Sequence, residues 1–260
     1  MHGGSVMSNP CTDLERIAIL LSRELQDNDI GSWGVGGIIP MAAIMLAKKT
    51  HAPGLIIGGE RVYNPKPSSL AAGLDDPVLM EKAEAIEGFW ELFGHWHKGV
   101  DFFFYSGMQI DVYGNLNLHL IGSIDNPKLR GPGVANISLI QRCKKIYLYS
   151  PDHSTKKFVE KVDFISAPGH LFGPQSKKDA GIFNDGPVIC VTPIATFDFD
   201  PATLRMRIKS IHSHSTFEEV KSKTGFELNE NAPTLVTIDP TDLELKILRE
   251  QIDLKGLLRK

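Results

Sequence analysis

The sequence predicts an α/β protein: a single open mixed-sheet domain flanked by helices. Amphipathic helical patterns dominate the first half of the 260 residues, whereas strand-like runs recur at roughly 8–12 residue spacing in the second half. One run, VDFFFY at 100–105, is continuously apolar, which is typical of a strand buried on both faces of a parallel sheet. We expect a flexible tail over residues 1–10 and one folded unit over residues 11–260.

The first half contains two clear helices. Residues 12–27 repeat apolar side chains at helical spacing, and Thr12 with Glu15 forms a possible capping box. GSWGVGGIIP at 31–40 reads as a glycine-rich turn, and a helix with Pro40 at its first position follows. The segment LII is a short buried strand, residues 64–77 form a long loop, and residues 77–99 are helical in parts.

The second half alternates strands and turns. After 100–105, two strand-like runs flank a turn at residues 113–115. Further strands are expected in KKIYLYS, VDFIS, PVICVT, TFDFD and LRMRIKSIH, which span 144–150, 162–166, 187–192, 196–200 and 204–212. Helices are expected over 217–225, capped by Ser215 or Thr216, and over 241–252.

Composition excludes several classes of protein. The net charge is −3 and the basic residues are scattered in pairs, so neither a nucleic-acid nor a membrane partner is indicated. The three cysteines, Cys11, Cys143 and Cys190, form no C-x-x-C, which argues against a disulfide framework or a zinc site and favours a reducing, cytoplasmic location. The N-terminus lacks the pattern of a signal peptide, and no apolar run reaches the ~18 residues of a membrane span.

Two pairs of histidines resemble metal ligands at first sight. They are His95 with His97 and His212 with His214. No carboxylate or cysteine stands at ligand spacing beside either pair, so we expect no metal site. Alternate positions along a strand or helix flank are the simpler interpretation.

Two glycine-rich segments could supply backbone donors. GVGGIIP at 34–40 precedes a helix, and GPGVAN at 131–136 precedes an apolar run. Free N–H groups there could hold an anion or a thioester oxygen, although each segment alone also fits a tight turn. Neither is a complete G-x-G-x-x-G or a P-loop.

Glu60 is the sharpest candidate for chemistry. It follows the apolar strand LII and the two glycines Gly58 and Gly59. A partly desolvated carboxylate at this place is a potential nucleophile. The alternative is a solvated loop residue paired with Arg61.

Five segments, taken together, resemble the β subunit of family I CoA-transferases, closest to the glutaconate CoA-transferase type. They are AKKTHAPGLIIGGE, GMQIDVYGNLN, LRGPGVAN, KVDFISAPGHLFGP and STFEEVKSKTGFEL, in this order. The resemblance runs from about Ile17 to the last helix. It implies a CoA-transferase-like open α/β fold and a separate α subunit that completes the active site, usually as α2β2.

The resemblance also implies a mechanism. Counting from Ala52-Pro53 places the family's catalytic glutamate on Glu60. The carboxylate attacks an acyl-CoA thioester, and a glutamyl-CoA intermediate then passes CoA to a carboxylic, possibly dicarboxylic, acid. CoA enters as part of the substrate, and no other cofactor is implied.

The resemblance further implies a set of residues that bind substrate or CoA. They are Gly36, Gly37, Gly107, Gln109, Gly131, Gly133, Val134, Ala135 and Asn136. N–H groups of the glycine-rich segments would stabilise the tetrahedral intermediates. For Gly107, Gln109 and the nearby Asp111, fixing the turn at 113–115 is an equal alternative.

A second branch of the superfamily remains open. The transferases have a small residue and glycine after the glutamate, whereas this chain has Arg61 and Val62. GGE at 58–60 and IEGF at 86–89 are similar to a branch whose members hydrolytically open a ring in steroid-derived CoA thioesters with a glutamate of the α subunit. A partner subunit without chemistry of its own is the third possibility.

Overall fold

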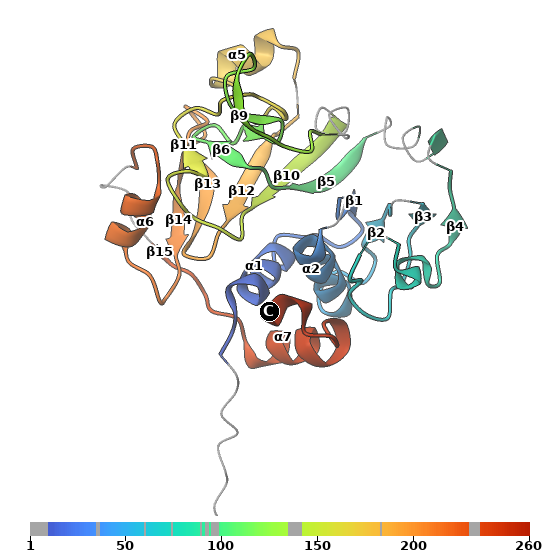
Figure 1. Cartoon of the computed structure of the whole chain (residues 1–260). Coiled ribbons are helices and arrows are strands. Elements are labelled where there is room, and N and C mark those ends of the chain that lie inside the picture. Colours follow the sequence, from blue (N-terminus) through green and yellow to red (C-terminus); the bar gives the residue numbers. More distant parts are fainter. Residues whose placement is uncertain are drawn as a thin grey trace, which may run out of the picture.

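A computed structural model of the chain describes residues 10–34, 37–59, 61–73, 75–88, 90–91, 94, 99–134, 142–182, 184–228 and 235–260. Within these residues the fold is built on one large sheet (Figure 1). Its strands, in spatial order, are β15 (Leu235–Val236), β14 (Met206–Ile211), β13 (Ala195–Phe199), β12 (Pro187–Val191), β10 (Cys143–Tyr149), β5 (Val100–Tyr105), β1 (Ile30–Ser32) and β2 (Ile56–Ile57).

The sheet is mixed, as the sequence predicts. The five neighbours from β2 to β12 are all parallel, and β13 runs antiparallel to both β12 and β14. The carboxyl ends of the parallel strands therefore meet along one edge, where ligands bind in open α/β sheets.

Helices cover one face of this sheet. Figure 1 shows α1 (Asp13–Ser22), α2 (Ile38–Lys49) and α7 (Asp242–Ile247) gathered on the same side, and α7 continues into η2 (Leu248–Ile252) and η3 (Leu257–Arg259). The predicted capping box of α1 is confirmed, because the Thr12 hydroxyl accepts from the N–H of Glu15 and the Glu15 carboxylate accepts from the N–H of Thr12.

The opposite face carries a smaller sheet and loops. It is the three-stranded sheet β11 (Phe158–Val159), β6 (Gln109–Asp111) and β7 (Leu116–Asn117), with α5 (Pro174–Asp179) and α6 (Phe217–Lys223) beyond it. Alternate residues of β5 separate the two layers: Phe102 and Phe104 pack with the helices, whereas Phe103 and Tyr105 pack with the small sheet. The predicted burial of this strand on both faces is thus confirmed.

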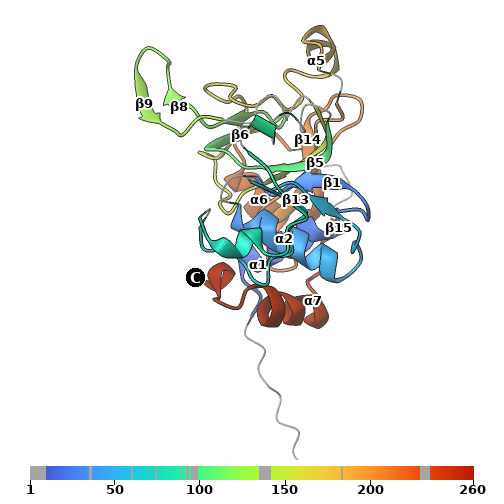
Figure 2. The ribbon, with the colours of Figure 1, turned by 90° about the vertical axis from the view of Figure 1, so that its right-hand side faces the viewer.

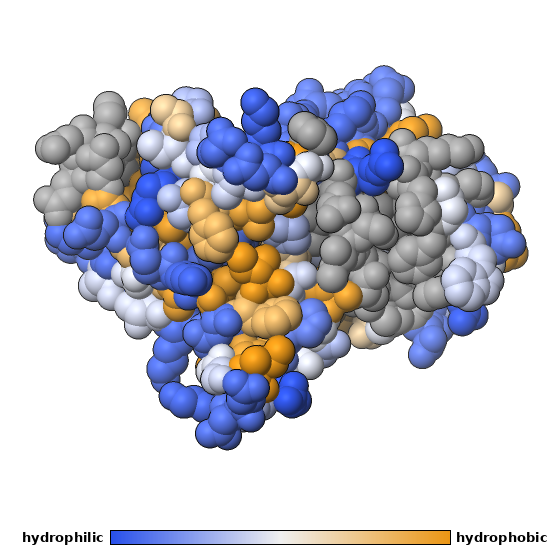
Figure 3. All heavy atoms as spheres, turned by 90° about the horizontal axis from the view of Figure 1, so that it is seen from above, coloured by the Kyte–Doolittle hydropathy of each residue, from blue (hydrophilic) through white to orange (hydrophobic). Residues whose placement is uncertain are grey.

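Two hairpins extend from this body. β3 (Val62–Tyr63) pairs with β4 (Ala85–Ile86), and η1 (Pro77–Met80) lies in the connection between them. β8 (Leu120–Gly122) pairs with β9 (Pro127–Arg130), and Figure 2 shows this hairpin standing away from the rest of the chain. Seen from above, hydrophobic residues form a band across the middle of the face, with hydrophilic residues around it (Figure 3).

Several expected elements differ from the structure. Residues 162–166 form no strand, because Asp163 and Ser166 use their polar groups to bind neighbouring loops. Residues 77–99 contain η1 and β4 where helix was expected, as far as they are described. The glycine-rich turn at 31–40 begins with a strand, β1, and α2 starts two residues before Pro40.

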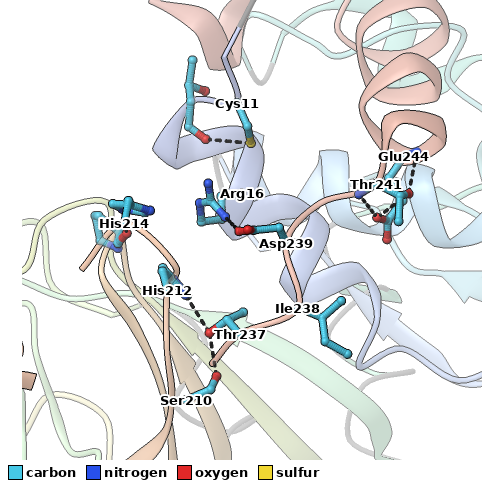
Figure 4. Close-up of polar contacts among 12 residues, drawn as sticks. Cys11, Arg16, Ser210, His212, His214, Thr237, Ile238, Asp239, Thr241 and Glu244 are labelled. Carbon is cyan, nitrogen blue, oxygen red and sulfur yellow. Dashed lines mark hydrogen bonds and ion pairs between the residues drawn. The ribbon is translucent and has the colours of Figure 1, made fainter. Parts of the chain in front are cut away.

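Polar contacts fasten the C-terminal segment to α1 (Figure 4). Arg16 of α1 lies 2.5 Å from the Asp239 carboxylate, and Arg249 binds the fully buried Glu15 at 2.7 Å. Burial alone would raise the pKa of Glu15, but hydrogen bonds from Arg249 and Thr12 outweigh it and lower that pKa. None of the described helices is long and apolar enough to cross a membrane.

Candidate functional site

A cavity of about 430 Å³ opens at the carboxyl edge of the parallel strands. Its described lining comes from the ends of β1, β5 and β10 and from two loops: Trp33, Gly34, residues 103–106, Leu118, residues 132–134 and Tyr149. These residues are mainly apolar and carry no ionised side chain at neutral pH. We call this space the sheet-edge cavity; it suits an acyl or pantetheine chain better than a free anion.

A smaller cavity of about 290 Å³ lies beside it, and Trp33 belongs to the lining of both. The other described residues around the smaller cavity come from the β3 hairpin and η1: Arg61, Val62, Asp75, Asp76, Leu79 and Met80. Trp33 therefore stands between an apolar space and a charged one.

The structure brings the two glycine-rich segments together. Gly34 from the first segment lines the sheet-edge cavity, as do Gly133 and Val134 from the second. The N–H groups of Gly131 and Gly133 already donate to the carbonyls of His119 and Leu118, at 2.8 and 2.9 Å. These two amides hold the loop against β7 and β8 in the structure, so they are not free donors there.

Gly37 and Gly107 shape the backbone around the cavity. A Cβ on Gly37 would lie 2.6 Å from the Trp33 carbonyl oxygen, so glycine lets the start of α2 pack against the end of β1. The carbonyl of Gly107 accepts from the ammonium of Lys157, which fixes the chain just after Ser106 of the cavity wall.

Four of the predicted site residues, Glu60, Gly36, Ala135 and Asn136, lie outside the described residues. The described neighbours of Glu60 are at the carboxyl end of β2. There Gly58 donates to the Gly31 carbonyl at 2.9 Å and Gly59 donates to the Val62 carbonyl at 2.8 Å. The assignment of Glu60 as nucleophile stays a prediction.

Gln109 and Asp111 are buried and serve the scaffold in the structure. The Gln109 side chain accepts from Asn117 and from the Asp163 N–H, and it donates to the Asp163 carboxylate. The Asp111 carboxylate accepts from the N–H groups of Tyr113 and Asn115 and from the Asn115 amide. Burial raises the pKa of Asp111 to about 6, although these bonds favour its charged form.

The same bonds join the two segments on which the resemblance most depends. The Asn115 carbonyl oxygen accepts from the N–H groups of Gly169 and Leu171, and its amide donates to the Leu171 carbonyl. The Ser166 hydroxyl accepts from the Leu118 N–H at 2.7 Å. The two segments therefore form one rigid unit, and Leu118 of that unit lines the cavity.

Sequence reasoning missed Trp33 and His119. The Ser166 hydroxyl, occupied as an acceptor by Leu118, lies 2.7 Å from His119 Nδ1 and donates to it, so the other ring nitrogen, Nε2, carries the proton. That nitrogen faces Gly133 of the cavity wall. The only available signal for Trp33 was a large aromatic residue inside a glycine-rich stretch after a strand.

An open sheet with an apolar cavity at the carboxyl edge of its parallel strands defines an α/β protein that binds a ligand at this edge. The model of the family described as Coenzyme A transferase matches residues 14–223. The chain therefore belongs to the Coenzyme A transferase family, as the sequence analysis expected.

Individual relatives agree with this membership. One subunit of 3-oxoadipate CoA-transferase from Pseudomonas knackmussii is 29% identical, with 90% of this chain and 91% of the relative covered. The crystal structure of glutaconate coenzyme A-transferase from Acidaminococcus fermentans matches with a TM-score of 0.86 at 26% identity, covering 96% of this chain and 97% of that one. The cholesterol ring-cleaving hydrolase IpdB subunit from Rhodococcus jostii is 28% identical, covering 84% and 83% of the two chains.

Proposed function

We propose that the chain is the β subunit of a heteromeric CoA-transferase that moves CoA from an acyl-CoA to a carboxylic acid. The observation that carries the proposal is the position of β2. The strand ends at Gly58 and Gly59, directly before Glu60, and it lies beside β1, whose end forms the wall of the sheet-edge cavity. The names of the 3-oxoadipate and glutaconate relatives support a dicarboxylic acid as the acceptor.

The chemistry requires an ionised carboxylate and a dry acyl site. A Glu60 oxygen attacks the thioester carbonyl, and collapse of the tetrahedral intermediate releases CoA thiolate and leaves an acyl-glutamyl anhydride. The thiolate then attacks the glutamyl carbonyl, which frees the first acid and forms glutamyl-CoA. An incoming acid reverses these steps. An apolar cavity limits hydrolysis of the anhydride.

The α subunit is part of this proposal. Relatives of this chain bear subunit names, which supports a partner of similar fold and an α2β2 assembly. Large hydrophobic side chains are exposed on this chain, including Ile86, Ile124, Leu129 and Phe172. A partner subunit that covers them would remove this apolar surface from water.

Hydrolysis of a cyclic CoA thioester is the second candidate. The structure places the two segments that resemble the hydrolase branch side by side, because β3 pairs with β4 and the Glu87 N–H donates to the Arg61 carbonyl at 2.8 Å. The likeness to the IpdB subunit supports the same alternative. In that case the catalytic carboxylate belongs to the α subunit and Glu60 is dispensable.

A covalent trap distinguishes the two functions. The complex with its α subunit is incubated with acetyl-, propionyl- or glutaryl-CoA in the absence of acceptor acid, reduced with borohydride and mapped by peptide mass spectrometry. We expect the Glu60 carboxyl group to become a primary alcohol, with loss of one oxygen and gain of two hydrogens. Glu60→Ala should lower transfer by about 10³-fold or more, since covalent catalysis is lost.

The matched control is Glu84→Gln, an exposed carboxylate of the β3–β4 hairpin that binds Asn64. This variant should still be trapped at Glu60. An unmodified Glu60 in a complex that consumes acyl-CoA, together with undiminished turnover by Glu60→Ala, would reject the transferase mechanism and favour the hydrolase.

A further inference from the structure

Trp33 is a buried side chain with an unused hydrogen-bond donor. It is 3% exposed, and its indole N–H has no hydrogen-bond partner in the part of the chain that the structure describes. Buried polar groups in native proteins are nearly always paired, so an unpaired donor at a cavity calls for a specific acceptor. An indole N–H donates only, which means that the missing group is an oxygen or another acceptor.

The orientation of the ring places this donor near the end of β2. The ring atom Cζ2, which adjoins the edge that carries the N–H, lies 3.4 Å from the point where a Cβ on Gly59 would stand. Gly59 immediately precedes Glu60. The donor therefore lies at the meeting point of β1 and β2, where the wall of the sheet-edge cavity reaches the proposed nucleophile.

Other donors around this cavity are already occupied. The N–H of Gly133 binds the Leu118 carbonyl, and that of Gly34 lies 3.4 Å from the Ser32 hydroxyl. Pro132 has no N–H. Among the described lining residues, the indole of Trp33 is thus the buried donor that a ligand can still engage.

We propose that the indole N–H of Trp33 binds an oxygen of the acyl group that is transferred, either the thioester carbonyl of acyl-CoA or the carboxylate of the incoming acid. The inference rests on the proposed function, which brings such an oxygen to the end of β2 in every step. It assigns Trp33 as a binding residue and gives its unpaired donor a partner only when substrate is present.

The test replaces the N–H without changing the shape of the ring. Trp33→3-benzothienylalanine exchanges the N–H for sulfur, and Trp33→Phe is the simpler second variant. Both are made in the full complex on a Glu60→Ala background, so that bound acyl-CoA is not consumed. Titration calorimetry then measures Kd for acetyl-, propionyl- and glutaryl-CoA, for free glutarate and for CoA itself.

We expect both Trp33 variants to bind the acyl-CoA thioesters about tenfold more weakly, the effect of one lost hydrogen bond, and to bind CoA unchanged. A loss confined to glutarate would identify the carboxylate of the acid as the acceptor instead. The melting temperature of the isosteric variant should not fall, because the N–H has no partner in the free protein.

Tyr147→Phe is the matched control. The buried Tyr147 hydroxyl donates to the Glu24 carbonyl at 3.0 Å and lines neither cavity. Its removal should lower the melting temperature and leave every Kd unchanged, the reverse of the pattern expected for Trp33.

The outcomes separate the two proposals. Equal binding of acyl-CoA by wild type and isosteric variant overturns the role of Trp33 and leaves the transferase function untouched. Weaker acyl binding in an enzyme that proves to hydrolyse its substrate would retain Trp33 and reject only the transferase. A complex whose wild type binds no acyl-CoA would reject both.

Discussion

Asn115 shows how residues that resemble catalytic groups can serve the scaffold. It is fully buried, and its amide makes two bonds to Leu171, one to Gly169 and one to Asp111, all between 2.8 and 3.0 Å. These bonds replace those that the separate loops would make with water. The polar residues of this motif thereby hold the cavity wall in place.

We therefore predict that Asn115→Ala lowers the free energy of unfolding by about 3–5 kcal/mol, because it leaves buried backbone donors and a carboxylate without partners. Chemical denaturation of the purified chain measures the change. Asn126→Ala, at the exposed tip of the β8–β9 hairpin, should stay within about 0.5 kcal/mol of wild type. Similar values for the two variants would contradict a scaffold role for Asn115.

At the scale of the element, β1 is a strand that only its neighbours specify. It has three residues and lies between β2 and β5 in parallel register. Its middle residue, Gly31, lies under the Phe102 ring, and a Cβ there would come within 2.5 Å of three ring atoms. Because β1 ends at Trp33, the packing of this glycine also positions the cavity wall.

Gly31→Ala should cost about 1–3 kcal/mol of stability, since Phe102 is fully buried and has no free space to move into. The matched control is Gly73→Ala, where no atom lies within 4 Å of the new Cβ and φ is not positive. That change should be neutral or slightly stabilising. Thermal unfolding compares the two, and equal melting temperatures would show that the Phe102 ring adapts freely.

Across the whole molecule, buried histidines set the response to acid. Burial lowers the pKa of His153, His170 and His212 to about 4. His153 is held between the Thr192 and Thr224 hydroxyls and stacks on Phe158. Their neutral forms fit the fold, whereas the unfolded chain binds protons at about pH 6.5.

The sign of the resulting pH dependence follows directly. The stability from neutral histidines is complete above about pH 6.5 and is lost as the pH falls toward 4, because unfolding then takes up protons. Asp111 acts in the opposite direction, since its raised pKa lets the folded state bind a proton between about pH 6 and 4. Near pH 5 the four groups together should give a net uptake of about two protons on unfolding.

We predict that the free energy of unfolding falls by about 3 kcal/mol per pH unit near pH 5, as far as these four groups determine it. Urea unfolding of the chain between pH 7 and 4.5 measures the slope. His153→Gln keeps a side chain that can bind both threonines and should reduce the slope by about one proton. An unchanged slope in this variant would show that His153 does not titrate on unfolding.

Sequence alone determined the features that depend on short-range bonds or on a repeated pattern. The caps Thr12 and Thr241 and the strand at 100–105 belong to this group, because a cap needs only a residue three positions away and a buried strand needs only its own side chains. The ordered motifs also indicated the family and the mixed sheet.

Tertiary structure decided what depends on contacts between distant segments. It made a strand of β1, removed the strand expected at 162–166 and gave Gln109 and Asp111 partners in the scaffold. It also placed Trp33 between two cavities with an unpaired donor. No local pattern contains this information, because burial and hydrogen-bond partners across more than 50 residues arise only when the chain has closed on itself.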